Sequence, residues 1–235
     1  MGIDESRDAS IGVEHLDKNE PCFTELERFV VTTLEPLPDE EVMDSFAQLP
    51  DDDYLKEEWV FRKRAYARGI LTEAGIEWHP DTDFFQSREI NEYAGDIKRI
   101  FAPAGEVIRD YTLKLLRGPF YRHFLGNGRY HFGLHQIRIV CDGQHEGHPV
   151  PEGYHQDGFD VVAIHCFQRD NIIGGKSFLR EGSPDGPCIL ENDLDPGVAL
   201  LFNDHRLYHY ATPITSRIPG LGCRDMCVLT FSLIP

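Results

Sequence analysis

The pattern of hydrophobic and polar residues changes near residue 125 of the chain. Before this point apolar residues recur at helical spacing, whereas after Gly128 short apolar runs are separated by glycine and proline. The second predicted helix follows Pro38 and opens with acidic residues, as the helix dipole prefers. The stretch 59–71 fits a helix and a strand equally well. The predicted helices are 24–34, 39–49 and 104–117.

The part of the chain after Gly128 is predicted to consist of strands and turns. Several short strands without crossover helices are typical of an antiparallel barrel or sandwich. The helix predicted for 104–117 carries its apolar residues on one stripe, so it is expected to pack on the outside of the sheet. The predicted fold class is therefore mainly β with flanking helices (α+β). The predicted strands are 130–141, 154–167, 176–180, 188–190, 198–203, 207–212 and 226–234.

Length and composition favour a single folded domain. The chain has 235 residues, of which 41% are hydrophobic, enough to bury one substantial core. Residues 1–20 are polar, acidic and without periodicity, so they are predicted to form a disordered leader. The expected organisation is one domain over 21–235, with a helical N-terminal part to about residue 125 and a β core over about 126–235.

The net charge limits the partners that the protein can bind, and the cysteines indicate the compartment in which it works. A net charge of −17 argues against nucleic acid and against an anionic membrane surface, because both would repel it. No apolar run is long enough to span a bilayer, and the start of the chain does not resemble a signal peptide. The six cysteines form no CxxC pair and have no regular spacing, so we expect reduced thiols in a cytoplasmic protein.

The segment 154–158, with the sequence YHQDG, carries the strongest chemical signal. His155 and Asp157 stand at i and i+2, and on a strand both side chains leave the same face. A second imidazole from a distant strand would complete a two-histidine, one-carboxylate set, which leaves positions open on ferrous iron. His209 is the candidate, and we prefer it to His205, which follows the turn signal Asn203-Asp204. Each piece alone is weak, because a lone strand histidine is usually packed or hydrogen-bonded.

Arg224 lies fifteen residues after His209, which is a hairpin's length. This spacing is enough to bring a guanidinium back beside the metal, where it would bind an anion. An arginine in a turn is more often a surface charge, which Asp225 could pair here. Arg217 is the alternative if Arg224 has no part in the site.

Four separated motifs recur in order over roughly the C-terminal 100 residues: 150–158, 174–177, 208–214 and 224–225. With them the chain resembles the bacterial Fe(II)/2-oxoglutarate dioxygenases of the free L-isoleucine 4-hydroxylase type. The resemblance implies a double-stranded β-helix, or jelly roll. It also implies that His155, Asp157 and His209 hold iron and that Arg224 binds the far carboxylate of 2-oxoglutarate. Many relatives carry serine or tyrosine where Met226 stands, so a second hydroxyl for that carboxylate must come from elsewhere.

The implied reaction uses O2 and 2-oxoglutarate to hydroxylate an unactivated C–H bond, with release of succinate and CO2. A free L-amino acid is the implied substrate, and its carboxylate and ammonium would need one cationic partner and one acidic or carbonyl partner. Two alternatives stay open: a cupin-type metalloenzyme that does not use 2-oxoglutarate, and a metal-free jelly-roll binding module. A cupin would be expected to use three or four histidines, and a binding module needs neither Asp157 nor Arg224.

Gln136 and Arg138 are the candidates for substrate binding. Their i, i+2 spacing in 134–140 turns both side chains to one face of the predicted strand. If that face lines the barrel, Arg138 is a buried cation that a substrate carboxylate would neutralise. Alternatively, this face is the solvent side of an edge strand. The sequence also leaves open whether the protein is a homo-oligomer.

Overall fold

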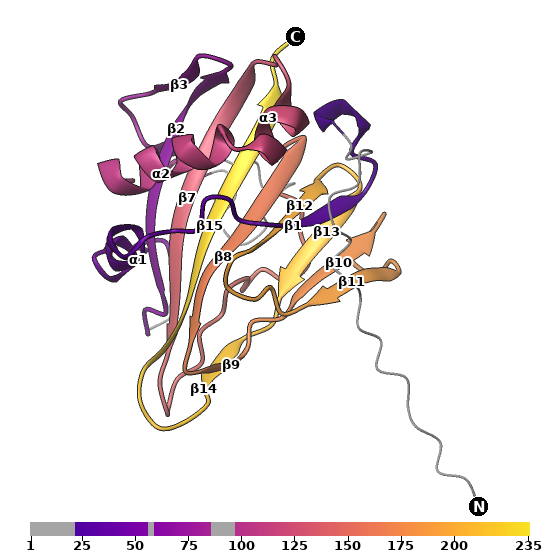
Figure 1. Cartoon of the computed structure of the whole chain (residues 1–235). Helices are drawn as coiled ribbons and strands as arrows, with labels where there is room; N and C mark the ends of the chain where they lie inside the picture. Colours follow the sequence, from indigo (N-terminus) through magenta and orange to yellow (C-terminus); the bar gives the residue numbers. More distant parts are fainter. Residues whose placement is uncertain (1–21, 56–58, 86–96) are drawn as a thin grey trace, which may run out of the picture.

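The computed structural model describes residues 22–55, 59–85 and 97–235. Within these ranges the chain is mainly β, with one long central sheet, a smaller sheet facing it and a few helices (Figure 1). None of the helices in these ranges has the length and apolar character needed to cross a membrane. The leader predicted for residues 1–20 lies outside the described residues.

The central sheet has eight strands in the order β1-β12-β8-β15-β7-β2-β3, with β6 beside β2. Neighbouring strands are antiparallel except for β2 and β6. Its longest pairing joins β15 to β7 over twelve residue pairs, from Gly222 opposite Cys141 to Leu233 opposite Tyr130. The strands are β1 (Phe29–Thr33), β2 (Arg62–Thr72), β3 (Gly75–Trp78), β6 (Ala102–Pro103), β7 (Tyr130–Cys141), β8 (Val161–Asp170), β12 (Val198–Asn203) and β15 (Gly222–Leu233).

A three-stranded sheet in the order β11-β10-β13 faces one side of the central sheet. Leu179, Leu190 and Leu207 of this small sheet pack against Phe202 and Met226 of the central sheet, and all five are buried. We call this side of the central sheet its inner face. The remaining strands are β4 (Asp83–Phe84), β5 (Arg99–Ile100), β9 (Ile172–Gly174), β10 (Ser177–Glu181), β11 (Cys188–Asn192), β13 (Leu207–Ala211) and β14 (Ile214–Ser216).

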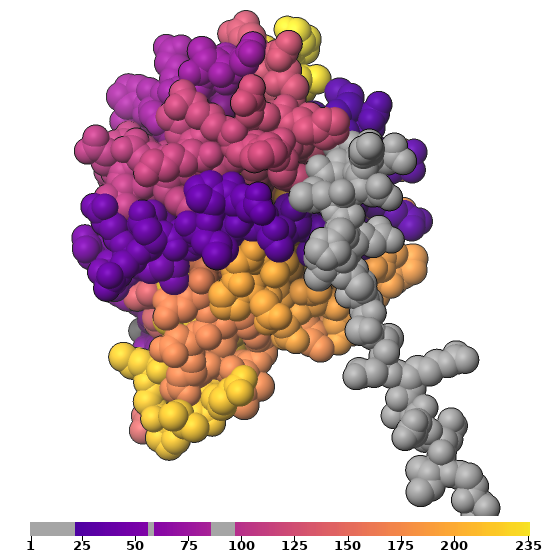
Figure 2. Space-filling view, viewed as in Figure 1, coloured from indigo at the N-terminus to yellow at the C-terminus, as the bar shows by residue number. Residues whose placement is uncertain are grey.

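Helices cover the opposite side of the central sheet, which we call its outer face. They are α1 (Glu40–Ala47), α2 (Glu106–Leu116) and α3 (Pro119–Leu125), with a short 3-10 helix, η1 (Phe23–Glu25). Phe46, Ile108 and Phe124 bury their side chains here against Phe167 and Phe231 of the sheet. Figure 2 shows the N-terminal part, indigo to magenta, spread over this face. The prediction that 104–117 packs outside the sheet is confirmed by α2.

The N-terminal part corrects two expectations. The predicted helix 24–34 is wrong, because Phe29–Thr33 is strand β1, paired with Val198–Phe202 of β12. Its residues include four β-branched side chains in a row after Phe29, which favour a strand once a partner strand is available. The ambiguous stretch 59–71 is strand β2. Residues before 125 therefore add strands as well as helices to the fold.

The C-terminal strands mostly follow the prediction. The strands expected over 130–141 and 198–203 are confirmed as β7 and β12. The strand expected over 154–167 is wrong in its first half, because β8 begins at Val161 and the preceding residues form a loop. The last strand begins at Gly222 rather than at 226, which places Arg224 inside it.

Candidate active site

Three side chains that the sequence singled out lie together between the two sheets. One ligand atom each from His155, Asp157 and His209 lies within 4.8 Å of the other two. The two Nε2 atoms of His155 and His209 are each 3.6 Å from an oxygen of Asp157. Two imidazoles and one carboxylate at this separation could hold a divalent metal such as ferrous iron on one side.

The chain brings the two histidines together through its backbone. His155 donates its N–H to the carbonyl of His209 at 3.2 Å, and His209 donates to the carbonyl of His155 at 2.9 Å. This isolated bridge joins the loop before β8 to strand β13. The expected alternation of His155 and Asp157 along one strand is therefore not what aligns them. The bridge places His155 beside His209, and Gly158, with φ +86°, follows Asp157 in the same loop.

Asp204 holds the loop that carries Asp157. Its buried carboxylate accepts the backbone N–H groups of Asp157, Gly158 and Phe159 at 2.9, 2.6 and 3.0 Å. Sequence reasoning used Asp204 only as part of a turn signal and missed this role. Its neighbour His205 is exposed and bonds to Asp160 at 2.8 Å, outside the three-residue cluster.

The three groups shift one another's pKa values. Burial opposes charge on His155, but Asp157 and the charge of Glu152 outweigh it and raise the pKa of His155 to about 9. Burial lowers the pKa of His209 to about 3. Burial would raise the pKa of Asp157, yet His155 and His209 hold it well below its usual range. A bound cation would take the place of the His155 proton.

The imidazole of His155 is oriented for such a cation. Its Nδ1 lies 3.0 Å from the carbonyl of Gly153, which can only accept, so Nδ1 donates and Nε2 is left as the metal-facing atom. The Nδ1 of His209 is buried without a hydrogen-bond partner among the described residues. The contact of His155 therefore fits a ligand that meets the metal through Nε2, whereas His209 lacks the second hydrogen bond that usually orients such an imidazole.

A cationic wall lines the same cavity, which has a volume of about 120 Å³. Arg62 is paired with Asp52 at 2.7 Å, whereas Arg64 contacts the Nδ1 of His135 at 2.6 Å. Burial, helped by the charge of Arg64, lowers the pKa of His135 well below its usual value, so His135 is neutral and accepts this bond. Arg99 is also buried in this wall. Sequence reasoning missed these arginines, although two of them alternate along β2.

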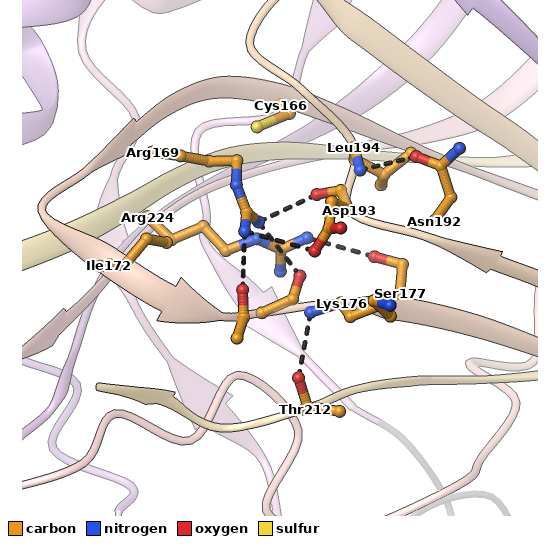
Figure 3. Close-up of polar contacts among 12 residues, drawn as sticks. Cys166, Arg169, Ile172, Lys176, Ser177, Asn192, Asp193, Leu194, Thr212 and Arg224 are labelled. Atoms are coloured by element: carbon orange, nitrogen blue, oxygen red, sulfur yellow. Dashed lines mark hydrogen bonds and ion pairs between the residues drawn. The ribbon is translucent and has the colours of Figure 1, made fainter. Parts of the chain in front are cut away.

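Arg224 lies on the inner face of β15, deeper between the sheets. Its Nη2 donates to the hydroxyl of Ser177 at 3.1 Å, and its buried Nε has no hydrogen-bond partner among the described residues (Figure 3). Burial lowers the pKa of Arg224 to about 10, so the guanidinium remains charged at neutral pH. It shares its face of β15 with Val228, which lines the cavity of the three-residue cluster.

The backbone at Gly175 lies close to the side chain of Arg224. Gly175 has φ +67°, and a Cβ there would lie 3.0 Å from the Cδ of Arg224 and 3.3 Å from a nitrogen of Arg169. Arg169 in turn donates to the carbonyls of Gly174 and Asp193, so it fixes this segment beside Arg224 (Figure 3).

The predicted substrate residues do not reach the cavity, and this prediction is corrected. The Nε2 of Gln136 donates to the hydroxyl of Ser45 in α1 at 2.8 Å, on the outer face. Arg138 makes a two-point ion pair with Asp225 at 2.6 and 2.7 Å, also on the outer face. Alternation along β7 instead turns His135 inward. Asp225 is thus the partner of Arg138, not of Arg224.

Comparison with known proteins adds a family and a fold. The sequence model of the 2OG-Fe dioxygenase family matches residues 43–230. Among solved structures, a bsmA homolog from Methylobium petroleophilum PM1 is 24% identical with a TM-score of 0.68, covering 94% of this chain and 97% of that one. IDO from Bacillus thuringiensis is 21% identical with a TM-score of 0.66, covering 94% and 100%.

A third solved structure, the Fe(II)/α-ketoglutarate-dependent dioxygenase TqaL, is 14% identical with a TM-score of 0.54, covering 89% of this chain and 83% of that one. Among curated proteins no sequence match was found. The structural matches confirm the predicted jelly-roll core with flanking helices.

Proposed function

The chain belongs to the 2OG-Fe dioxygenase family, and from this premise we propose that it hydroxylates a free L-amino acid. The family uses Fe(II) with 2-oxoglutarate and O2. The observation that carries the proposal is the convergence of His155, Asp157 and His209 within 4.8 Å. The free amino acid as substrate rests on the resemblance of the four motifs and is supported by the fold shared with IDO.

In this proposal His155, Asp157 and His209 hold the iron. Three protein ligands on one side leave the other positions for 2-oxoglutarate and O2. When bound, iron couples the oxidative decarboxylation of 2-oxoglutarate, to succinate and CO2, to the insertion of one oxygen atom into a C–H bond. The protein positions the reactants and excludes water. A cupin-type site would recruit another histidine, but His135, which lines the cavity, is engaged with Arg64.

Arg224 is proposed to bind the far carboxylate of 2-oxoglutarate. Its charge is buried, its Nε is available, and a carboxylate would supply the missing acceptor. Ser177 supplies the hydroxyl that Met226 cannot, because its Oγ already lies 3.1 Å from the Arg224 guanidinium. The residue that replaces the missing hydroxyl thus comes from β10 of the smaller sheet.

The test is succinate release with ferrous iron and 2-oxoglutarate across the twenty amino acids. We expect one amino acid, or a few of similar shape, to raise succinate release above the level without substrate, with a product 16 mass units heavier by one added oxygen. His155→Ala and Asp157→Ala should abolish this turnover and the retained iron while the circular dichroism spectrum is kept. Normal iron content and turnover in either variant would contradict the assignment of the ligands.

A further inference from the structure

The cavity beside the proposed iron ligands has two charged sides. Arg64 and Arg99 contribute positive charge, and Glu152 contributes a carboxylate. Both guanidinium groups lie over the same pair of rings: Arg64 is 4.2 Å from the ring centre of Phe101, and Arg99 is 4.8 Å from that of Phe84. The rings hold the two cations side by side on one wall.

Arg64 carries a buried charge that has no ion-pair partner in the part of the chain that the structure describes. Its side chain belongs to a residue that is 9% exposed, and no carboxylate of the described residues lies within ion-pair distance of it. Its Nη2 bonds to the neutral His135, and its buried Nε has no hydrogen-bond partner within the described ranges. An uncompensated buried cation is costly, and an anionic ligand would remove that cost.

Glu152 contributes a carboxylate, of charge opposite to that of Arg64. Its Oε2 is buried without a hydrogen-bond partner in the described part of the chain, and its Oε1 lies 3.7 Å from the Nε2 of His155. Glu152 also lines the cavity, so a cation of the substrate would supply the hydrogen-bond donor that its buried Oε2 lacks.

We propose that this cavity binds the amino acid as a zwitterion, with Arg64 and Arg99 on its α-carboxylate and Glu152 on its α-ammonium group. The inference rests on the proposed function and names the residues that recognise its substrate class. Charge balance supports one carboxylate and one ammonium, because the arginine pair and Glu152 differ in sign. A simple amine would leave the arginine pair without a countercharge from the ligand, and a simple carboxylic acid would leave Glu152 without one.

A second cavity borders the first. It is larger, about 480 Å³, and shares Phe84 and Thr230 with it as lining residues. Arg64, Arg99 and Glu152 select the backbone of the amino acid, not its side chain.

The experiment measures binding without turnover, with Mn(II) in place of iron and with 2-oxoglutarate present. Thermal shift with each of the twenty amino acids selects the tightest binder for calorimetric titration. Its decarboxylated amine and its deaminated acid serve as matched probes. The variants are Arg64→Met and Glu152→Gln, which keep shape and remove charge. Arg28→Met is the control, because Arg28 is an exposed arginine paired with Glu181, and neither residue lines the cavity.

We expect Arg64→Met to weaken the amino acid and the deaminated acid at least tenfold and to leave the amine unchanged. Glu152→Gln should weaken the amino acid and the amine to a similar extent and leave the acid unchanged. Binding of 2-oxoglutarate alone should stay within twofold of wild type in both variants. Arg64→Lys, which keeps a point charge but loses the planar fork, should recover part of the loss.

Each contrary result has its own meaning. If Arg64→Met weakens 2-oxoglutarate and not the amino acid, Arg64 serves the cosubstrate and the inference is overturned. If both variants bind the amino acid as tightly as wild type does, the two residues are structural and the inference fails while the proposed function stands. If the wild type binds none of the twenty amino acids, the free amino acid as substrate fails with it.

Discussion

The two faces of the central sheet bury arginines in different ways. On the outer face the Nε and Nη2 of Arg138 donate to the two carboxylate oxygens of Asp225 on the neighbouring strand. On the inner face Arg224 meets a serine hydroxyl and Arg64 meets a neutral histidine. The outer arginine completes an internal ion pair, whereas neither inner arginine has an ion-pair partner among the described residues, so their charge can serve a ligand.

The contrast is sharpest between two adjacent residues. Arg224 and Asp225 are neighbours in sequence, yet alternation along β15 sends them to opposite faces and to different partners. A buried charge with an internal partner contributes to stability when both members are present. A buried charge without one is retained at a cost to stability, which is typical of binding sites. The difference predicts which substitutions will affect folding and which will affect ligands.

The largest effect is expected from Arg138→Ala on the outer face. It leaves the carboxylate of Asp225 buried and unpaired, and should lower the free energy of unfolding by about 3 kcal/mol, measured by urea denaturation. Burial already raises the pKa of Asp225 even beside Arg138, so the loss should shrink as pH falls and the carboxyl is protonated. The double variant Arg138→Leu with Asp225→Leu removes both charges, so it should lose less stability than Arg138→Ala. An Arg138→Ala variant as stable as wild type would contradict the difference between the two faces.

Asp204→Ala tests a buried anion whose partners are backbone groups. Three N–H groups of the Asp157 loop lose their acceptor, so we expect a loss of about 2 kcal/mol in stability and at least tenfold in metal affinity. Titration with Mn(II) measures the second effect. Asp204→Asn retains one oxygen, so its stability and metal affinity should lie between those of wild type and Asp204→Ala. Unchanged metal binding in Asp204→Ala would show that the loop holds its shape without this carboxylate.

Arg224→Leu should behave in the opposite way to Arg138→Ala. It removes a buried charge that has no ion-pair partner within the described ranges, so stability should be kept or raised. The requirement for 2-oxoglutarate should rise at least tenfold, which corresponds to about 1.4 kcal/mol, because a charge-assisted contact is lost. Arg217→Leu, at an exposed arginine, is the matched control. A large loss of stability with unchanged 2-oxoglutarate dependence would place Arg224 in the same class as Arg138.

The smallest effect is expected from Ser177→Ala. It removes one neutral hydrogen bond, worth about 1 kcal/mol, so the 2-oxoglutarate requirement should rise about fivefold with little change in stability. The same assay as for Arg224→Leu measures it. In the double variant the two losses should not add, because both residues contact the same carboxylate in the proposal. Full additivity would separate Ser177 from the Arg224 site.

The sequence was sufficient for the residues whose chemistry is tied to their type. A histidine, an aspartate and a second histidine in a recurring order predicted the cluster that the structure brings together. It also predicted β7 and β12 to the residue, because turn-forming residues bound each of them on both sides. The reason given for the alignment was wrong, since the bridge to His209 and the carboxylate of Asp204, rather than a strand, shape the loop.

What the sequence left undetermined depends on distant partners. The spacing in 24–34 fits a helix and a strand, and pairing of Phe29 with Phe202 decides between them. The two faces of β7 look alike in sequence, and only α1 on one side and the small sheet on the other distinguish Gln136 from His135. Arg64 lay in an ambiguous stretch. Its alternation with Arg62 was a signal, but one that needed the strand to be recognised first.

Because of the bridge between His155 and His209, hydrogen exchange of two backbone amides can report metal occupancy. Each of these residues donates its amide proton to the other, so both protons exchange with solvent only when the two segments part. Parting them would pull the proposed ligands away from a shared ion, which must leave first. Deuterium uptake at these two amides should therefore slow in proportion to metal concentration over its dissociation constant. The fraction of loaded protein can then be followed with no substrate and no oxygen in the sample.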